Sequence, residues 1–446
     1  MPTRTLTSAL CLCVAATALA DSTAFLNVNV IPMTSDVVIE SQTVIVIDGR
    51  IASIGGVDGT PIPEGANVVD GTDRYLMPGL SEMHGHVPGG SSQNLDRVLS
   101  LYVANGITTV RGMLGQPSHL ELRERIDSGE TLGPRLVTSG PSLNGRSVSS
   151  PQAGIEMVRA QHAAGYDFLK IHPGLTRDEF DAIAATANEL GMPFAGHVPE
   201  DVGVERALAA GIATIDHLDG YMQTLLPPNE DPSGGLAGFF GVFIADQANA
   251  EGIAGIAAAT ARAGVWNVPT ESLFEHVTSA SLDPDDLADR AEMKYMPAST
   301  VQQWRQYKYE LLSDANYSAA KAARAIELRR QLIRELHAAG AGLLLGSDSP
   351  QVFNVPGFAL HRELAYLVAA GLTPFAALQT GTVNTARFLR RDSFGVLQEG
   401  MAADLVLLDA NPLQDISNSR RIHGVMVRGR WLARTDLDEL LRRFER

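Results

Sequence analysis

The chain has 446 residues, a length that allows two or three domains, or one large barrel with an appended domain. Hydrophobic residues make up 45% and charged residues 19%, as in folded globular proteins and unlike disordered ones. The formal net charge of −16, without a large cluster of Lys and Arg, argues against nucleic-acid and anionic-membrane partners, because binding to such surfaces depends on basic clusters.

Residues 1–20 have the pattern of a secretory signal peptide. Arg4 supplies a positive charge, residues 8–20 form an apolar run, and Ala18-Leu19-Ala20 matches the small-residue cleavage signature. The alternative is a membrane anchor, but spanning a bilayer takes about 20 apolar residues and this run is shorter. We therefore expect cleavage after Ala20 and export of the mature chain to the periplasm or the medium.

The cysteine content limits the chemistry of the mature chain. The only two cysteines, Cys11 and Cys13, lie inside the predicted signal peptide. A mature chain without cysteine has no disulfides, no thiol nucleophile and no thiolate metal ligand. Any metal would have to be bound by His, Asp, Glu or a modified Lys.

The mature chain divides into two patterns. Residues 21–75 alternate β-branched and polar residues between turn signals, and residues 391–434 do so again before a short helix at 435–446. Between them, residues 76–390 alternate short strands with helical segments. The predicted strands are residues 76–87, 108–113, 135–140, 168–172, 193–198, 214–218, 266–270 and 342–348.

Eight strand–helix units favour an α/β fold, a (β/α)8 TIM barrel, with a small β-sandwich domain formed from both chain ends. The rival is an open doubly wound sheet, for which the chain lacks both GxGxxG and GxxxxGK[ST]. Two long inserts, 219–264 and 271–340, follow the sixth and seventh strands. Inserts at the carboxyl ends of barrel strands usually form the substrate pocket or its lid.

Six polar residues coincide with the carboxyl ends of the predicted strands. His84 and His86 are two residues apart, so strand alternation places both side chains on one face. A His-x-His pair alone carries little weight in a chain with 11 histidines. The other four residues end the fourth, fifth, sixth and eighth strands: Lys170, His197, His217 and Asp348. Barrel enzymes place their catalytic groups at this end, so we expect the six side chains to meet.

Lys170 and Asp348 are harder to explain structurally than the histidines. A histidine at a strand end often has only a packing role. Lys170 lies between Leu169 and Ile171 on a strand expected to be buried, where an unpaired ammonium is very costly. Asp348 ends a continuous apolar run, which a purely structural role seldom requires. Both residues therefore indicate a chemical function.

With these residues in place, the mature chain resembles the amidohydrolase superfamily, in particular its branch similar to imidazolonepropionases and secreted prolidases. The resemblance spans the whole mature chain. The motifs that carry it, around His84, His86 and the other four positions and elsewhere in the chain, are Met77-Pro78-Gly79-Leu80, Gly106-Ile107-Thr108-Thr109-Val110-Arg111, Gly133-Pro134-Arg135, Phe168-Leu169-Lys170-Ile171, Gly196-His197, Asp216-His217, Gly346-Ser347-Asp348, Gly371-Leu372-Thr373-Pro374 and Gly400-Met401-Ala402-Ala403-Asp404-Leu405.

The resemblance implies a binuclear centre of two Zn²⁺ or similar divalent ions. In it, His84, His86 and Asp348 would bind the buried metal, and His197 and His217 the exposed one. Lys170, carboxylated by carbon dioxide, would bridge both. An amine next to two dications is disfavoured as ammonium, and its carbamate is an anion that such metals bind well. The ligand set leaves a position open for water, as catalytic sites do.

The implied activity is zinc-dependent hydrolysis of an amide C–N bond by attack of a metal-bridging hydroxide, with Asp348 as general base. The expected substrate is a small-molecule amide or dipeptide carrying a free carboxylate, such as an Xaa-Pro dipeptide or an N-acyl amino acid. Cyclic amides, carbamates, esters and lactones remain alternatives on the same site. A noncatalytic binding homologue is the alternative of another class, and a serine hydrolase is disfavoured because GxSxG is missing.

The sequence also departs from the resemblance. Glu82 and Gly112 stand where relatives commonly carry Asp, and Asn144-Gly145-Arg146 replaces a Gly-Gly-His familiar in the branch. These differences leave the six ligands intact but put the substrate in doubt.

Four further residues are candidates near the site. Tyr221 is placed like tyrosines that polarise the scissile carbonyl in relatives, although packing is the alternative. His172 shares the face of Lys170 and could line the pocket. Arg146 and Arg111 could bind a substrate carboxylate. The alternatives are a solvated loop position for Arg146 and pairing with buried carboxylates for Arg111.

Overall fold

The computed structural model describes residues 22–89, 92–228, 230 and 236–446. The predicted signal peptide, with Cys11 and Cys13, lies outside the described residues. None of the helices in the described ranges combines the length and apolar character needed to cross a bilayer.

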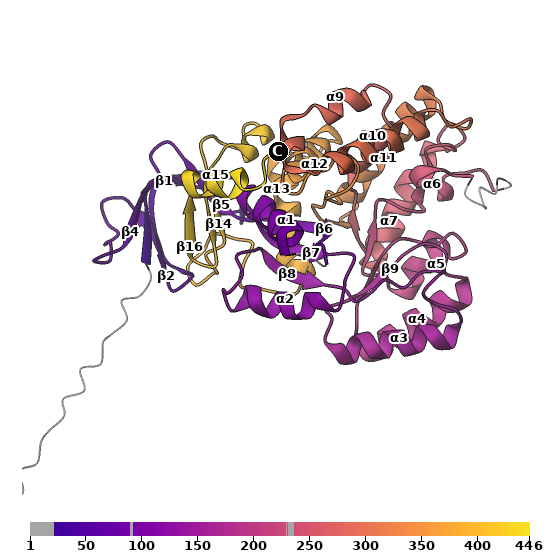
Figure 1. Ribbon diagram of the computed structural model, residues 1–446, viewed down its shortest axis with the longest axis horizontal. Helices are drawn as coiled ribbons and strands as arrows, with labels where there is room; N and C mark the ends of the chain where they lie inside the picture. The colour runs from indigo at the N-terminus through magenta and orange to yellow at the C-terminus, as the bar shows by residue number, and fades with distance from the viewer. Residues whose placement is uncertain (1–21, 90–91, 229, 231–235) are drawn as a thin grey trace, which may run out of the picture.

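Strands from both chain ends form one eight-stranded sheet at one end of the molecule (Figure 1), as the sequence predicted. Its order is β16-β15-β14-β5-β1-β2-β3, with β4 beside β1. The bounds are β1 (Ser22–Val30), β2 (Ile39–Ile47), β3 (Arg50–Gly56), β4 (Asn67–Asp70), β5 (Tyr75–Pro78), β14 (Leu405–Leu408), β15 (Ile422–Val427) and β16 (Arg430–Ala433). The two ends meet where β5 pairs antiparallel with β14 and parallel with β1. A second, facing layer stays a prediction.

One predicted strand, residues 76–87, is wrong as a single element. It is divided between β5, which belongs to the eight-stranded sheet, and β6 (Leu80–Gly85), which begins the parallel strands. Pro78 pairs with Leu405, and Gly79 turns the chain toward the next sheet. Proline is tolerated at a strand end, and a following glycine permits an abrupt change of direction.

The remaining strands are parallel and lie in two groups. The bounds are β6, β7 (Ile107–Gly112) and β8 (Arg135–Thr138) in one sheet, and β9 (Leu169–Ile171), β10 (Phe194–Gly196), β11 (Thr214–Asp216), β12 (Trp266–Val268) and β13 (Gly342–Leu343) in the other. Main-chain hydrogen bonds also join the edges of the two sheets. The N–H of Asp167 donates to Thr138 O at 3.0 Å, and that of Met83 to Leu345 O at 2.8 Å. This α/β arrangement is consistent with a TIM-barrel-like fold.

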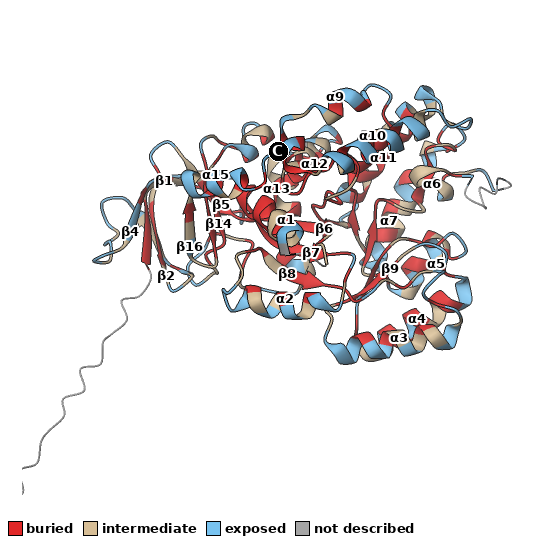
Figure 2. Ribbon diagram, viewed as in Figure 1, coloured by how far each residue is buried: buried red, intermediate tan, exposed pale blue. Residues whose placement is uncertain are grey.

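Helices cover the parallel strands, with their buried faces inward and their exposed faces outward (Figure 2). Those that follow β6 to β10 are α1 (Ser92–Ala104), α2 (Ser118–Asp127), α3 (Pro151–Ala164), α4 (Arg177–Leu190) and α5 (Gly203–Ala210). In α4, Thr176 and Glu179 form a reciprocal capping box, and Gly191 ends the helix in the left-handed conformation. These signals explain where α4 begins and ends.

The two long inserts are largely helical. The first contains α6 (Tyr221–Thr224), η1 (Phe239–Gly241), η2 (Ala250–Gly252) and α7 (Ile253–Ala263). The second contains α8 (Glu271–Thr278), α9 (Pro284–Ala288), η3 (Ala291–Tyr295), α10 (Ala298–Leu312) and α11 (Ala319–Ala338). After β13 follow α12 (Phe358–Ala369), α13 (Pro374–Thr380), α14 (Val383–Phe388), η4 (Ile416–Arg420) and α15 (Arg434–Arg442). All eight residues of α8 are buried, which makes this helix part of the core.

Candidate metal centre

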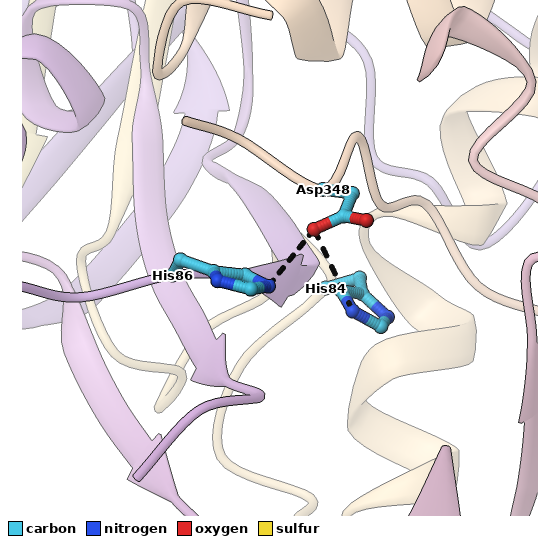
Figure 3. Close-up of side chains that lie close together, drawn as sticks. All are labelled: His84, His86 and Asp348. Atoms are coloured by element: carbon cyan, nitrogen blue, oxygen red, sulfur yellow. Dashed lines mark ion pairs between the residues drawn. The ribbon is translucent and has the colours of Figure 1, made fainter. Parts of the chain in front are cut away.

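His84, His86 and Asp348 converge at the carboxyl ends of the parallel strands (Figure 3). His86 Nε2 lies 2.9 Å and His84 Nε2 lies 3.7 Å from Asp348 Oδ1. One ligand atom from each residue fits within 4.8 Å of the others. Metal–ligand bonds of about 2.0–2.2 Å place two ligands of one ion roughly 3–3.5 Å apart, so the spacing suits a divalent ion.

His217 and His197 lie directly beside this group. The ring centres of His84 and His217 are 4.4 Å apart, and those of His197 and His217 are 4.6 Å apart. Burial, helped by nearby positive charge, holds the pKa of His84 and His217 well below the ordinary value. Both imidazoles are therefore neutral, which is the form that binds a metal.

Lys170 is fully buried on β9, and no described residue accepts a hydrogen bond from its Nζ. Burial lowers the pKa of this amine to about 8, against the opposing effect of the Asp216 and Asp348 carboxylates. A buried amine without a partner is costly in a finished structure. The Asp348 carboxylate raises the pKa of this amine, and the charge of Lys170 lowers the pKa of His84 and His217. This influence, with no hydrogen-bond acceptor among the described residues, fits an amine that is modified or binds a further group.

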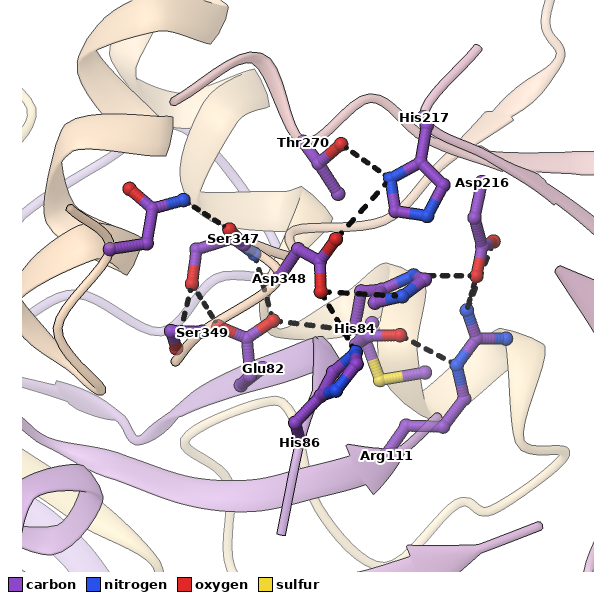
Figure 4. Close-up of polar contacts among 12 residues, drawn as sticks. Glu82, His84, His86, Arg111, Asp216, His217, Thr270, Ser347, Asp348 and Ser349 are labelled. Atoms are coloured by element: carbon purple, nitrogen blue, oxygen red, sulfur yellow. Dashed lines mark hydrogen bonds and ion pairs between the residues drawn. The ribbon is translucent and has the colours of Figure 1, made fainter. Parts of the chain in front are cut away.

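Each of three imidazoles has a polar partner on its Nδ1 side. Asp216 Oδ2 lies 2.7 Å from His84 Nδ1, and Thr270 Oγ1 lies 2.9 Å from His217 Nδ1 (Figure 4). Asp219 Oδ2 lies 3.0 Å from His197 Nδ1. Metal-binding histidines usually hydrogen-bond through the nitrogen that does not face the ion, which fixes the ring. The arrangement thus leaves Nε2 of each ring free to bind a metal.

Arg111 has the alternative role considered for it, as partner of a buried carboxylate. Its guanidinium donates to both oxygens of Asp216 at 3.2 Å and, through Nε, to Met83 O at 2.6 Å. The aromatic rings of Phe168 and Phe388 lie 5.5 and 5.4 Å from it. Arg111 therefore holds Asp216 against His84, and it is not among the residues that line the pocket over His84, His86 and Asp348.

Glu82 ties strand β6 to the segment that carries Asp348. It accepts hydrogen bonds from the N–H of His84 at 3.0 Å and of Ser347 at 2.8 Å, and from the Ser347 hydroxyl. Burial raises the pKa of this carboxyl to about 8. Glu82 stands where relatives commonly carry Asp, so this difference concerns a residue that supports the candidate ligands and not a ligand itself.

Two of the predicted residues are directed away from the centre. The Tyr221 hydroxyl donates to Asn267 Oδ1 and contacts Thr260 Oγ1, both at 2.9 Å, and burial raises its pKa. Arg146 is exposed in its loop, where Asn144 Oδ1 accepts its backbone N–H at 2.8 Å. Neither residue lines the pocket that lies over His84, His86 and Asp348. Tyr221 therefore has the packing role, and Arg146 the solvated loop position, that were the alternatives to a role at the site.

A pocket of about 430 Å³ opens over the candidate centre. Five of the six predicted ligands line it: His84, His86, His197, His217 and Asp348. His172 lines it too, with its ring centre 5.0 Å from that of His197, and burial lowers its pKa to about 2. Whether this neutral ring contacts a substrate stays a prediction.

A larger cavity, about 570 Å³, opens at the other end of the parallel strands, against Arg111, Phe168 and Trp266. None of the predicted ligands lines it. The candidate site is therefore identified by the chemistry of the residues that line it, because the larger cavity is lined by none of the predicted ligands.

Sequence reasoning missed two groups of residues. The imidazole rings are positioned by Asp216, Asp219 and Thr270. Of these, Asp216 could have been found from the sequence, because it directly precedes His217 in the motif Asp216-His217. The other group comes mainly from the inserts and lines the pocket: Phe239, Phe240, Leu273, Gln303, Trp304, Tyr307, Gln351 and Val352. The inserts were expected near the pocket, but without strand periodicity nothing showed which side chains face it.

The residues fit a divalent metal on their own chemistry. The donors are imidazole nitrogens and carboxylate oxygens, and two buried polar atoms, Lys170 Nζ and Asp348 Oδ1, make no hydrogen bond to any described residue.

The chain is similar to several known proteins. The family model described as "Amidohydrolase family" matches residues 75–432, which include all six predicted ligands. Ochratoxinase of Aspergillus niger is 24% identical over 374 residues, covering 76% of this chain and 71% of that protein. A prolidase-like protein of Bifidobacterium longum superposes with a TM-score of 0.66 at 25% identity, covering 95% of this chain and 98% of that one. For bottromycin amidohydrolase the TM-score is 0.70 at 24% identity, with 94% and 88% covered.

Proposed function

The chain belongs to the amidohydrolase family, and from this premise we propose that it is a metal-dependent hydrolase cleaving the C–N bond of a small amide. The observation that supports the proposal most is the convergence of His84, His86 and Asp348 beside His197, His217 and the unpartnered amine of Lys170. The strand geometry, which would close as a (β/α)8 barrel, brings them together from the ends of five different strands, and all of them except Lys170 line one pocket.

His84, His86 and Asp348 would hold one zinc or similar divalent ion, and His197 and His217 a second. When bound, such ions lower the pKa of a coordinated water and polarise a carbonyl oxygen. The residues that hold the imidazole rings, Asp216, Asp219 and Thr270, fix the directions of the Nε2 atoms.

Lys170 would supply the bridge as a carbamate. With its pKa lowered to about 8, an appreciable part of the side chain is the free amine at neutral pH. A free amine adds to carbon dioxide and loses a proton, giving an anion with two oxygen donors. Burial without a hydrogen-bond acceptor among the described residues supports this modification.

Asp348 is the proposed general base. Its Oδ1 faces His84 and His86, and its Oδ2 lies 3.7 Å from His217 Nδ1, so the carboxylate stands at the centre of the site. From there it can take the proton of the attacking water and return it to the leaving nitrogen.

The reaction is better supported than the substrate. Prolidase, ochratoxinase and bottromycin amidohydrolase are named after amide substrates or amide cleavage. Xaa-Pro dipeptides and N-acyl amino acids both carry a free carboxylate, for which Arg146 and Arg111 were the expected partners. Neither arginine reaches the pocket. An ester, lactone, carbamate or cyclic amide on the same site is the second candidate.

A hydrolysis panel tests the proposal. Zinc-loaded protein is given N-acyl amino acids, Xaa-Pro dipeptides, uncharged anilides, aryl esters and lactones, with chelator-treated protein as the control. Metal-dependent cleavage of at least one amide is expected. Loss of the amide reaction with retention of ester or lactone cleavage would favour the second candidate, and no cleavage at all would favour a noncatalytic homologue.

Export is proposed from residues 1–20 alone. Mass spectrometry of the protein recovered from the periplasm or medium is expected to find Asp21 as the first residue. A chain that keeps residues 1–20 would contradict cleavage after Ala20.

A further inference from the structure

The wall of the pocket that faces the candidate metal ligands is aromatic and apolar. Phe239 and Phe240 come from η1 in the first insert, and Trp304 and Tyr307 from α10 in the second. Leu273 and Val352 extend the same wall. Two segments far apart in the sequence therefore form one hydrophobic surface over the site.

Phe240 is the part of this wall that touches the ligands. Its ring lies nearly parallel to that of His217, with centres 4.7 Å apart and planes at 14°, and 6.0 Å from that of His197. Its backbone is in the left-handed region, at φ 47° and ψ 41°. A non-glycine residue is strained there and persists only where its surroundings hold it. The backbone of Phe240 is thus held in the conformation that places its ring against His217.

The aromatic residues also contact each other across the inserts. The ring centre of Phe239 lies 4.4 Å from that of Phe240 and 6.4 Å from that of Tyr307. Edge and offset contacts at these distances stabilise aromatic pairs. A flat apolar group entering the pocket can make the same kinds of contact with Phe240, Trp304 and Tyr307.

Cationic side chains do not line this wall among the described residues. Its polar groups are the neutral amides of Gln303 and Gln351 and the Tyr307 hydroxyl. The arginine nearest to His217, Arg329, is buried and donates to Glu271 and to the carbonyls of His217 and Pro269. A carboxylate held against this wall would lose water without gaining a counter-ion, in a chain of net charge −16.

We propose that the pocket selects amides whose part remote from the scissile bond is an uncharged aromatic or bulky apolar group, with Phe240, Trp304 and Tyr307 determining this specificity. The inference rests on the proposed amide hydrolysis and names its substrate class. It replaces the free carboxylate expected from the sequence. A cavity of about 430 Å³ is within the range of small-molecule sites and has room for an aromatic ring and an amide.

A matched pair of substrates tests the selectivity. Anilides of 3-phenylpropanoic acid are made with either a carboxylate or a carboxamide at the para position of the acyl ring, and a second pair carries these groups on the amine ring. The two groups have nearly the same shape and differ in charge. We expect kcat/KM for the carboxamide to exceed that for the carboxylate at least tenfold in one of the two pairs. A ratio below tenfold in both pairs would overturn the inference.

A pair of variants on one helix tests the residues. Tyr307 and Tyr309 both lie on α10 and are both 40% exposed, but only Tyr307 lines the pocket. Tyr307→Ala is expected to raise KM for the uncharged anilide at least threefold with little change in kcat, and Tyr309→Ala to leave both unchanged. Equal effects of the two substitutions, or none from Tyr307→Ala, would remove Tyr307 from the wall.

Binding of an uncleavable analogue separates the selectivity from the reaction. In the ketomethylene analogue the amide N–H is replaced by CH2, and calorimetry gives its Kd with the metal-loaded protein. Tighter binding of the carboxamide form without cleavage of any amide would retain the pocket assignment and refute the proposed function. Cleavage of amides without any preference would retain the function and refute the selectivity.

Discussion

At the candidate centre, three imidazole rings are oriented by polar neighbours that are not themselves candidate metal ligands. Asp216 is held by Arg111 and in turn contacts His84, so a buried arginine acts on the candidate metal site through two side chains. This chain of contacts explains why Arg111 is buried although a lone guanidinium would not be.

Replacing Lys170 by alanine is expected to lower the metal content and to abolish most activity. The substitution removes the proposed bridge between the two ions, so the loss should exceed the roughly 10- to 100-fold typical of changing a residue behind a ligand. A short carboxylate in the buffer should restore part of the rate. Lys294→Ala, which changes an exposed lysine, is the control. Full activity of the Lys170 variant would refute the binuclear assignment.

The Asp348→Asn substitution tests the general base separately from metal binding. Asparagine keeps the shape and one coordinating oxygen but cannot accept a proton. We expect a folded protein that retains most of its zinc and turns over about 10²- to 10⁴-fold more slowly. Zinc is measured by atomic absorption and turnover by product formation. A decrease below about tenfold would assign the base to another group.

Among the strands, β10 shows how a backbone position protects the site. Gly196, the last residue of β10, has a φ of 128°, and a Cβ atom there would lie 2.5 Å from Ile171 O and 2.9 Å from Lys170 Cδ. Side chains are disfavoured in this backbone region, and the neighbouring carbonyl cannot move without disturbing the strand pair. Glycine is therefore needed at position 196 to leave room for the Lys170 side chain.

Gly196→Ala is therefore expected to lower both stability and metal content. The new methyl group would displace Lys170 and the strand that carries it, so zinc binding should weaken even in the fraction that folds. Gly191→Ala on the preceding loop is a matched control for a positive φ, because open space surrounds its Cβ position. The melting temperature and the zinc content are measured for both variants. Equal zinc content in the two would contradict the steric argument.

The elements could be predicted where one periodicity dominates. The positions of the eight parallel strands follow from short apolar runs, and α4 follows from its caps and its helical period. The division at Pro78 was missed because both halves are apolar and continuous in sequence. Strand β13 ends at Leu343, and beyond it the N–H of Leu345 donates to Thr380 O, outside the parallel sheet. Asp348 is thus positioned by a loop.

Across the whole molecule, buried acids join the helices of the second insert to each other and to α12. Glu363 on α12 accepts hydrogen bonds from the N–H groups of Glu271 and Ser272, at 2.9 and 2.6 Å, in the first turn of α8. Glu271 in turn accepts from Arg329 at 2.8 Å. Burial raises the pKa of Glu363 to about 8, although the two N–H groups oppose this effect.

The raised pKa predicts a loss of stability with increasing pH. Below about pH 4.5 the carboxyl is protonated in both states, and between 4.5 and 8 only the folded state keeps the proton. The free energy of unfolding therefore decreases as pH rises through this window. Glu363→Gln mimics the protonated form, so its melting temperature should fall less than that of the wild type between pH 5 and 8. Glu124→Gln, at an exposed position, is the control. Parallel curves for Glu363→Gln and wild type would contradict the assignment.

The sequence could predict the ligands better than the pocket. Strand ends come together by topology, so His84, Lys170 and His217 could be placed from their positions in eight repeated units. The aromatic wall depends on how two inserts fold back over these ends, and nothing in their composition distinguishes Trp304 from a core residue. The pairing of the two chain ends could be inferred because the strands at each end needed neighbours to complete a sheet. In the structure, β5 and β14 form the pair that joins the two ends.

Metal reconstitution tests the central claim most directly. Protein stripped by a chelator is titrated with Zn²⁺ while bound metal and amide hydrolysis are followed on the same samples. The account predicts that activity is lost on stripping and returns with added zinc, reaching its maximum at two ions per chain. A folded protein that binds no zinc, or one that hydrolyses the amide equally well after stripping, would contradict it.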